Sequence, residues 1–217
     1  MLNDNGKYYL TKDLVQLITL FFICNLFLSI SLGFIFRNDS IINYIAIFAQ
    51  LLSYIITLSL SSKLKKDILK LSNFIGLNHL FTYIIALVSL GLFYFAVMFF
   101  VDFLKWDHIS EQLTLVETLK PGYLKSFHII SFLILSFPFP FFEELIFRGF
   151  LINFFKERFS YIAAIIISSL LFGLLHEGHF FTTTIFGVIL CLENKVTKSL
   201  TPGIITHILW NFLNLTF

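Results

Sequence analysis

The residues of this chain best suited to chemistry are two consecutive glutamates in one of its most apolar segments. Glu143 and Glu144 lie there with Arg148, and His176 and His207 follow in later apolar segments. A charged side chain at bilayer depth costs about 3 kcal/mol or more unless it is paired or faces water, so such groups usually mark functional sites. Carboxylate and imidazole groups in an apolar setting therefore predict a buried polar site, and these residue types favour hydrolysis.

Spacing along the helix predicts different tasks for the two glutamates. Glu144 and Arg148 are four residues apart and share a helix face, whereas Glu143 points about 100° away, toward another helix. A buried ion triad that only holds helices together is the alternative, but one arginine does not need two carboxylates. Pro138 and Pro140 precede the glutamates. Each proline removes a backbone donor, so we expect the helix to kink or restart there and to make room for water or substrate.

The two histidines are less specific signals when each is taken alone. His176 closes an apolar segment, where a lone histidine is usually an interfacial residue. His207 and Asn211 are four residues apart on one helix face, and they would form either an interhelical hydrogen-bond clasp or part of a site. Counted from the basic flanks, Glu143, His176 and His207 lie at depths of roughly 20, 26 and 14 Å. Tilt and the proline kink must bring them together if they act as one site.

The composition is that of a membrane protein. Hydrophobic residues make up 58% of the 217 residues and charged residues only 13%, against about 25% charged residues in soluble domains. The lipid bilayer is therefore the expected surrounding. A net charge of +2 without a basic stripe excludes nucleic acid as a partner. Cys24 and Cys191 lie in apolar runs without metal-ligand or redox spacing, so we interpret them as small core residues.

Seven apolar runs predict an all-α, polytopic membrane protein with about seven transmembrane helices around the buried polar site. The runs cover residues 14–36, 41–60, 80–101, 127–155, 159–175, 180–192 and 200–217. The sixth run is short for a span, so we expect it to be tilted, half-buried or re-entrant. We interpret residues 1–217 as a single membrane domain, with three motif-free spans in 1–125 and a motif-bearing catalytic core in 126–217.

The distribution of lysine and arginine predicts the orientation. Basic residues concentrate before the first span and after the second, fourth and sixth spans, and such loops are cytoplasmic under the positive-inside rule. The N-terminus is then cytoplasmic and the C-terminus is outside, in what we expect to be a bacterial plasma membrane. Loop 102–125 is external, and its amphipathic patch 109–119 is expected to lie on the outer surface. The run 14–36 is too long for a signal-peptide core and lacks a cleavage site, so it stays as a helix.

Three motifs, in order and each in an apolar segment, resemble the signatures of the CAAX protease and bacteriocin-processing (CPBP) family of intramembrane endopeptidases. The motifs are Glu143-Glu144-Leu-Ile-Phe-Arg148-Gly149, Phe172-x-x-x-His176 and His207-x-x-x-Asn211. The resemblance covers about residues 137–211 and is to the type II CAAX prenyl endopeptidase-like proteins, in their bacterial branch. It implies an all-helical polytopic fold and peptide-bond hydrolysis within the membrane.

The resemblance also implies roles for the motif residues. Glu143 and His176 activate water, His207 and Asn211 stabilise the oxyanion, and Glu144 and Arg148 support them. Family members are often labelled metalloproteases, and Glu143, His176 and His207 would form a zinc site of the two-His, one-Glu type. No His-Glu-x-x-His helix is present, and the roles given above need no metal, so we favour a mechanism without a cofactor and keep zinc as the alternative.

The function that these observations favour is an intramembrane endopeptidase whose substrate is a membrane-associated peptide or protein precursor. The bacterial branch implies processing of a bacteriocin or pheromone, or self-immunity. A non-catalytic immunity or scaffold protein could use the same buried network for folding. A small transporter is the third class, but the sequence shows neither an inverted repeat nor paired broken helices in its two halves.

Overall fold

The computed structural model describes residues 11–35, 42–60, 80–107, 125–176 and 178–216, and within these ranges every regular element is a helix. The all-α prediction is confirmed. The elements are α1 (Thr11–Ile35), α2 (Ile42–Leu60), α4 (Leu80–Val97), η2 (Met98–Phe103), α6 (Lys125–Ser136), α7 (Pro138–Glu144), η3 (Leu145–Leu151), α8 (Ile152–Lys156), α9 (Tyr161–Leu174), α10 (Phe180–Thr197) and α11 (Thr201–Thr216). Here η marks a π-helical segment. The element α4 continues into η2, and α6 to α8 form one long rod, so the described residues make seven rods.

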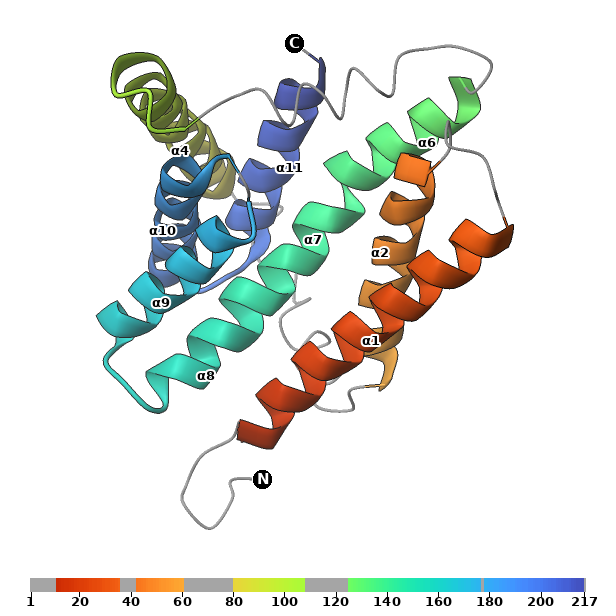
Figure 1. The fold of residues 1–217 in the computed structure, drawn as a ribbon. Helices are drawn as coiled ribbons and strands as arrows, with labels where there is room; N and C mark the ends of the chain where they lie inside the picture. The colour runs from red at the N-terminus through yellow and green to blue at the C-terminus, as the bar shows by residue number, and fades with distance from the viewer. Residues whose placement is uncertain (1–10, 36–41, 61–79, 108–124, 177, 217) are drawn as a thin grey trace.

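The long rod from α6 to α8 runs through the middle of the bundle (Figure 1). On one side α2 packs against α6 and α7, and α1 packs against α2. On the other side lie α4, α9, α10 and α11, of which α11 packs against α6 and α7 and α9 packs against η3 and α8. Polar side chains on the middle rod can therefore face the helices that carry the second and third motifs.

Among the residues that the structure describes, four helices are long and apolar enough to cross a membrane: Thr11–Ile35, Leu80–Phe103, Ile129–Lys156 and Phe180–Thr197. The helix of the sixth run is longer than the run itself, because α10 has 18 residues and continues past Leu192 to Thr197. It is partly buried among its neighbours, as one of the three expectations had it, and its tilt stays a prediction. The apparent break was Glu193, whose side chain is buried and hydrogen-bonded, so the helix does not end there. The shorter apolar helices are α2 and α9, and α9 has 14 residues.

The proline break predicted before the glutamates is confirmed. The helix α6 ends at Ser136 and α7 begins at Pro138, its first helical residue. Proline is tolerated at this position because the first amides of a helix have no intrahelical acceptor. Glu143 and Glu144 are the last two residues of the restarted helix α7.

Large apolar side chains cover the outside of the bundle as well as its core. Phe93, Phe172 and Phe186 are almost fully buried, whereas Phe27 and Phe95 are 68% and 72% exposed. A soluble monomer rarely exposes so much apolar surface, but hydrocarbon chains would cover it. The composition and the structure therefore agree on a membrane setting.

The predicted orientation depends mainly on loops that lie outside the described residues, namely 61–77, most of 102–125 and the patch 109–119. The beginning of α1 and the end of α11 lie at opposite ends of the bundle (Figure 1). An odd number of rods that alternate in direction places the two ends of the chain in this way. The sidedness itself stays a prediction.

Candidate active site

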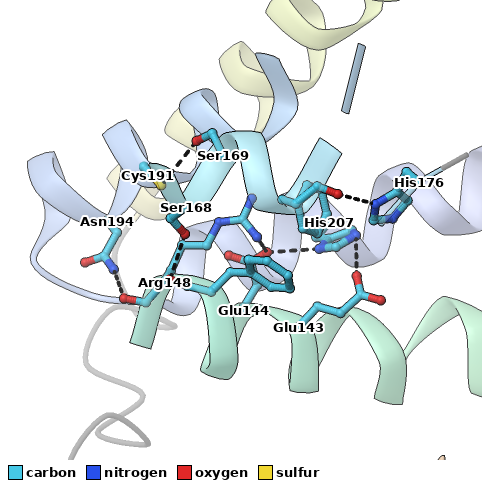
Figure 2. A network of polar contacts seen from close by, with 11 residues as sticks. Glu143, Glu144, Arg148, Ser168, Ser169, His176, Cys191, Asn194 and His207 are labelled. Carbon is cyan, nitrogen blue, oxygen red and sulfur yellow. Dashed lines mark hydrogen bonds and ion pairs between the residues drawn. The ribbon is translucent and has the colours of Figure 1, made fainter. Parts of the chain in front are cut away.

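Glu144 is the centre of a buried ionic cluster between α7, η3 and α11 (Figure 2). Its Oε1 lies 2.9 Å from Nη1 of Arg148 and 3.0 Å from Nδ1 of His207. The side chains of Glu144 and Arg148 are each 1% exposed. The pairing predicted from their four-residue spacing is confirmed, and His207 joins it from a different helix.

Glu143 points in another direction and faces the same histidine. Its Oε2 lies 3.6 Å from Nε2 of His207, and its side chain is 14% exposed, more than that of Glu144. The prediction that Glu143 faces a different helix is confirmed, and the helix is α11. The imidazole of His207 thus lies between two consecutive carboxylates, with one ring nitrogen toward each (Figure 2).

Arg148 lies in the π-helical segment η3. Short π-helical segments occur often at functional sites, because the wider turn disturbs the regular backbone hydrogen bonds. Side chains of neighbouring helices bond to carbonyl groups of η3. Ser168 of α9 donates to the Phe147 carbonyl at 3.1 Å, and Asn194 of α10 donates to the Arg148 carbonyl at 3.5 Å. These contacts fix η3, and with it the arginine, against α9 and α10.

Phe172 of α9 connects the three motifs through its ring. The Arg148 guanidinium carbon lies 4.4 Å from the ring centroid, a cation–π arrangement in an apolar setting. The same ring lies 4.4 Å from the imidazole of His176 and 5.8 Å, edge-on, from that of His207. Phe172 therefore holds both imidazoles and the guanidinium in place, which gives the aromatic residue of the second motif a physical role.

His176 lies just beyond the end of α9 and is half-buried. Its Nδ1 lies 2.7 Å from the Phe172 carbonyl oxygen, and since a carbonyl only accepts, Nδ1 must carry the hydrogen. The neutral ring then presents Nε2 as an acceptor. Within the described residues His176 makes no hydrogen bond to Glu143, so the structure joins Glu143 directly to His207 and leaves His176 beside that pair (Figure 2).

Asn211 lies one turn beyond His207 on α11. Its amide nitrogen donates to the Leu135 carbonyl at 3.0 Å, close to the proline break in the middle rod. An asparagine amide has two hydrogens, so one remains for another acceptor. The contact ties α11 to α6 and matches the helix clasp that was one of the two interpretations of this residue.

Two buried carboxylates were missed at the sequence level. Glu193 of α10 is 3% exposed and accepts a hydrogen bond from Thr206, and a single acidic residue in an apolar run was a signal that could have found it. Asp107, also 3% exposed, accepts hydrogen bonds from the Phe181 and Thr182 amides at 3.2 and 2.6 Å and so caps α10. No local signal in the sequence links Asp107 to a helix more than 70 residues away.

The zinc alternative requires Glu143, His176 and His207 to converge. Within the ranges that the structure describes, no group of three or more His, Cys, Asp or Glu side chains is arranged to hold a metal ion. Glu143, His176 and His207 are therefore not arranged as zinc ligands in the described structure.

Comparison with known proteins gives one result at the level of the family. Residues 125–213 match a family model described as Rce1-like, Type II CAAX prenyl endopeptidase Rce1-like. The matched range begins with α6, ends within α11 and contains all three motifs. No curated protein and no solved structure matches the chain.

Proposed function

We propose that this chain is an intramembrane endopeptidase, because residues 125–213 match the family model described as Type II CAAX prenyl endopeptidase Rce1-like. The observation that carries the proposal is the pair of Glu143 and His207, 3.6 Å apart inside the bundle. A carboxylate and an imidazole facing each other in an apolar interior are suited to move a proton and to stabilise charge.

In the proposed reaction Glu143 is the general base. Its Oε2 takes a proton from a water molecule, the water oxygen attacks the carbonyl carbon of the scissile bond, and the proton passes on to the leaving amine. General base catalysis of this kind contributes about 10²- to 10⁴-fold in rate. His176 orients the same water, because its Nε2 is the free acceptor of the ring.

His207 and Asn211 are the proposed donors to the oxyanion. The Nδ1 hydrogen of His207 is directed at Glu144, so donation to substrate requires a second hydrogen on Nε2. His207 in this role is therefore an imidazolium, and the carboxylates on either side offset its charge. Asn211 would use the amide hydrogen that Leu135 leaves free. One such donor lowers the barrier by roughly 3 to 4 kcal/mol.

The proposed substrate is a membrane-associated peptide or protein precursor. The apolar outer surface of the bundle supports a membrane setting for the site, and the family match supports the hydrolysis of a peptide bond. Within this class we favour a bacteriocin or pheromone precursor, or self-immunity. The alternative is a non-catalytic immunity or scaffold protein, for which the Glu144, Arg148 and His207 cluster would serve only to hold helices together.

The test uses protein purified in detergent and two sets of fluorogenic peptides. One set carries a prenylated CAAX terminus, and the other consists of unprenylated hydrophobic precursors. We expect cleavage of at least one set, a loss of about 10²- to 10⁴-fold in Glu143→Gln, and full activity in Glu157→Gln. Glu157 is a matched control because it lies in the connection between α8 and α9, away from the motif residues, where it pairs with its neighbour Arg158 at 3.9 Å. A folded Glu143→Gln variant that cleaves at the wild-type rate would contradict the proposed base.

A further inference from the structure

Glu193 of α10 is a buried carboxyl group that the proposed reaction does not use. Thr206 Oγ1 donates to its Oε1 at 2.8 Å, and Ser89 of α4 is a second hydroxyl partner. Thr206 is 0% exposed and directly precedes His207 on α11. Glu193 therefore lies behind the site, bound to the helix that carries the catalytic imidazole.

The second oxygens of Glu193 and Glu144 both lie beside Gly203 of α11. A Cβ atom on Gly203 would lie 3.3 Å from Glu144 Oε2 and 3.4 Å from Glu193 Oε2. Both oxygens are buried, and neither is hydrogen-bonded to any other residue that the structure describes. Since Gly203 has no side chain, the two oxygens face the same small volume beside its Cα.

The charges around this volume decide which of the two groups is ionised. Arg148 and His207 both contact Oε1 of Glu144, at 2.9 and 3.0 Å. The hydrogen-bond partners of Glu193 are neutral hydroxyl groups, those of Thr206 and Ser89, and its electrostatic neighbours are Glu144 and Arg148. A neighbouring carboxylate disfavours ionisation of a second carboxyl group, and a buried charge without a partner is strongly unfavourable. Direct contact with the Arg148 guanidinium favours the negative charge on Glu144.

We propose that Glu193 is a neutral carboxylic acid whose hydroxyl group donates to Oε2 of Glu144, directly or through one water molecule. Glu193 is then a positioning residue for the proposed peptidase reaction, on which this inference rests. With Oε1 held by Arg148 and His207 and Oε2 held by Glu193, the Glu144 carboxylate cannot rotate. The orientation of the His207 ring, and with it the distance between Nε2 and Glu143, is fixed by this arrangement.

Two substitutions separate this role from a structural one. In Glu193→Gln the amide nitrogen can donate to Glu144 and the amide oxygen can accept from Thr206, so glutamine reproduces both hydrogen bonds of the neutral acid. Turnover of this variant should stay within about threefold of wild type, a difference small against the effect of losing a positioning group.

Glu193→Met removes both the donor to Glu144 and the acceptor for Thr206. We expect kcat to fall on the order of 10- to 100-fold with KM nearly unchanged, because the catalytic geometry loosens while the substrate contacts remain.

A readout independent of activity tests the proton itself. In infrared difference spectra of the detergent-solubilised protein, the carbonyl band of a protonated carboxyl group should be present in wild type and in Glu157→Gln and should be lost in Glu193→Gln. An unchanged band, or a Glu193→Gln variant as impaired as Glu193→Met, would overturn the proposal. If wild type cleaves no peptide, the proposed function fails, and the infrared comparison still decides the state of Glu193.

Discussion

Nε2 of His207 lies 3.6 Å from Oε2 of Glu143, beyond direct hydrogen-bonding distance but within reach of a small shift or a shared proton. The other nitrogen of the ring is held by Glu144 at 3.0 Å. The orientation of the imidazole is therefore set by a carboxylate that is paired with Arg148, and the less buried Glu143 is left to react. In the proposed reaction, consecutive residues on one helix therefore have separate roles, support for Glu144 and catalysis for Glu143.

The role of His207 can be tested with two substitutions, one that keeps a hydrogen-bond donor and one that removes it. His207→Gln keeps a donor near the oxyanion and should retain some activity, whereas His207→Ala should fall further, by about 10²- to 10³-fold for the loss of one donor. The measurement is kcat on the peptide that wild type cleaves best. Equal and complete loss in both variants would contradict the donor role and would point to a metal ligand.

Metal dependence is tested by elemental analysis and exhaustive chelation of the same purified sample. We expect no stoichiometric metal and unchanged turnover after chelation, because the motif residues can activate water and stabilise the oxyanion without an ion. Stoichiometric metal, with activity that disappears on chelation and returns on adding zinc, would establish the alternative.

Glu144→Gln should reduce stability more than it reduces catalysis. The substitution leaves the Arg148 guanidinium buried without a charged partner, and breaking such a pair costs about 3 to 5 kcal/mol. The free energy of unfolding in detergent measures this loss of stability, with Glu157→Gln as a control outside the cluster.

A variant that lacks both Glu144 and Arg148 tests the same ion pair. The double variant Glu144→Gln, Arg148→Met removes the unpaired charge, so it should be less destabilised than the sum of the two single variants. Simple additivity of the two effects would mean that the pair makes no net contribution to folding.

The topology is tested with cysteines at positions 72 and 110 in a background without Cys24 and Cys191. The lysine distribution predicts that position 110 is external and position 72 cytoplasmic. In intact cells a membrane-impermeant thiol reagent should label only the cysteine at 110, and both cysteines after permeabilisation. Labelling of 72 instead of 110 would invert the orientation.

Hydrophobicity and spacing already determined the helical fold, the proline break and the pairing of Glu144 with Arg148. Each of these follows from local rules. A run of apolar residues must satisfy its backbone within a helix, a proline removes a backbone donor, and residues four apart share a helix face. The three motifs also placed the candidate site in the second half of the chain.

Only the tertiary structure decided which residues of different helices meet. Nothing in the sequence predicted that the packing of α11 against α7 brings His207 to 3.6 Å from Glu143. The sequence also gave no reason to expect that Glu193 and Glu144 both lie beside Gly203 of α11. Contacts between helices depend on crossing angles and on the sizes of the side chains at the crossing, and these are properties of the packed bundle that no single segment carries.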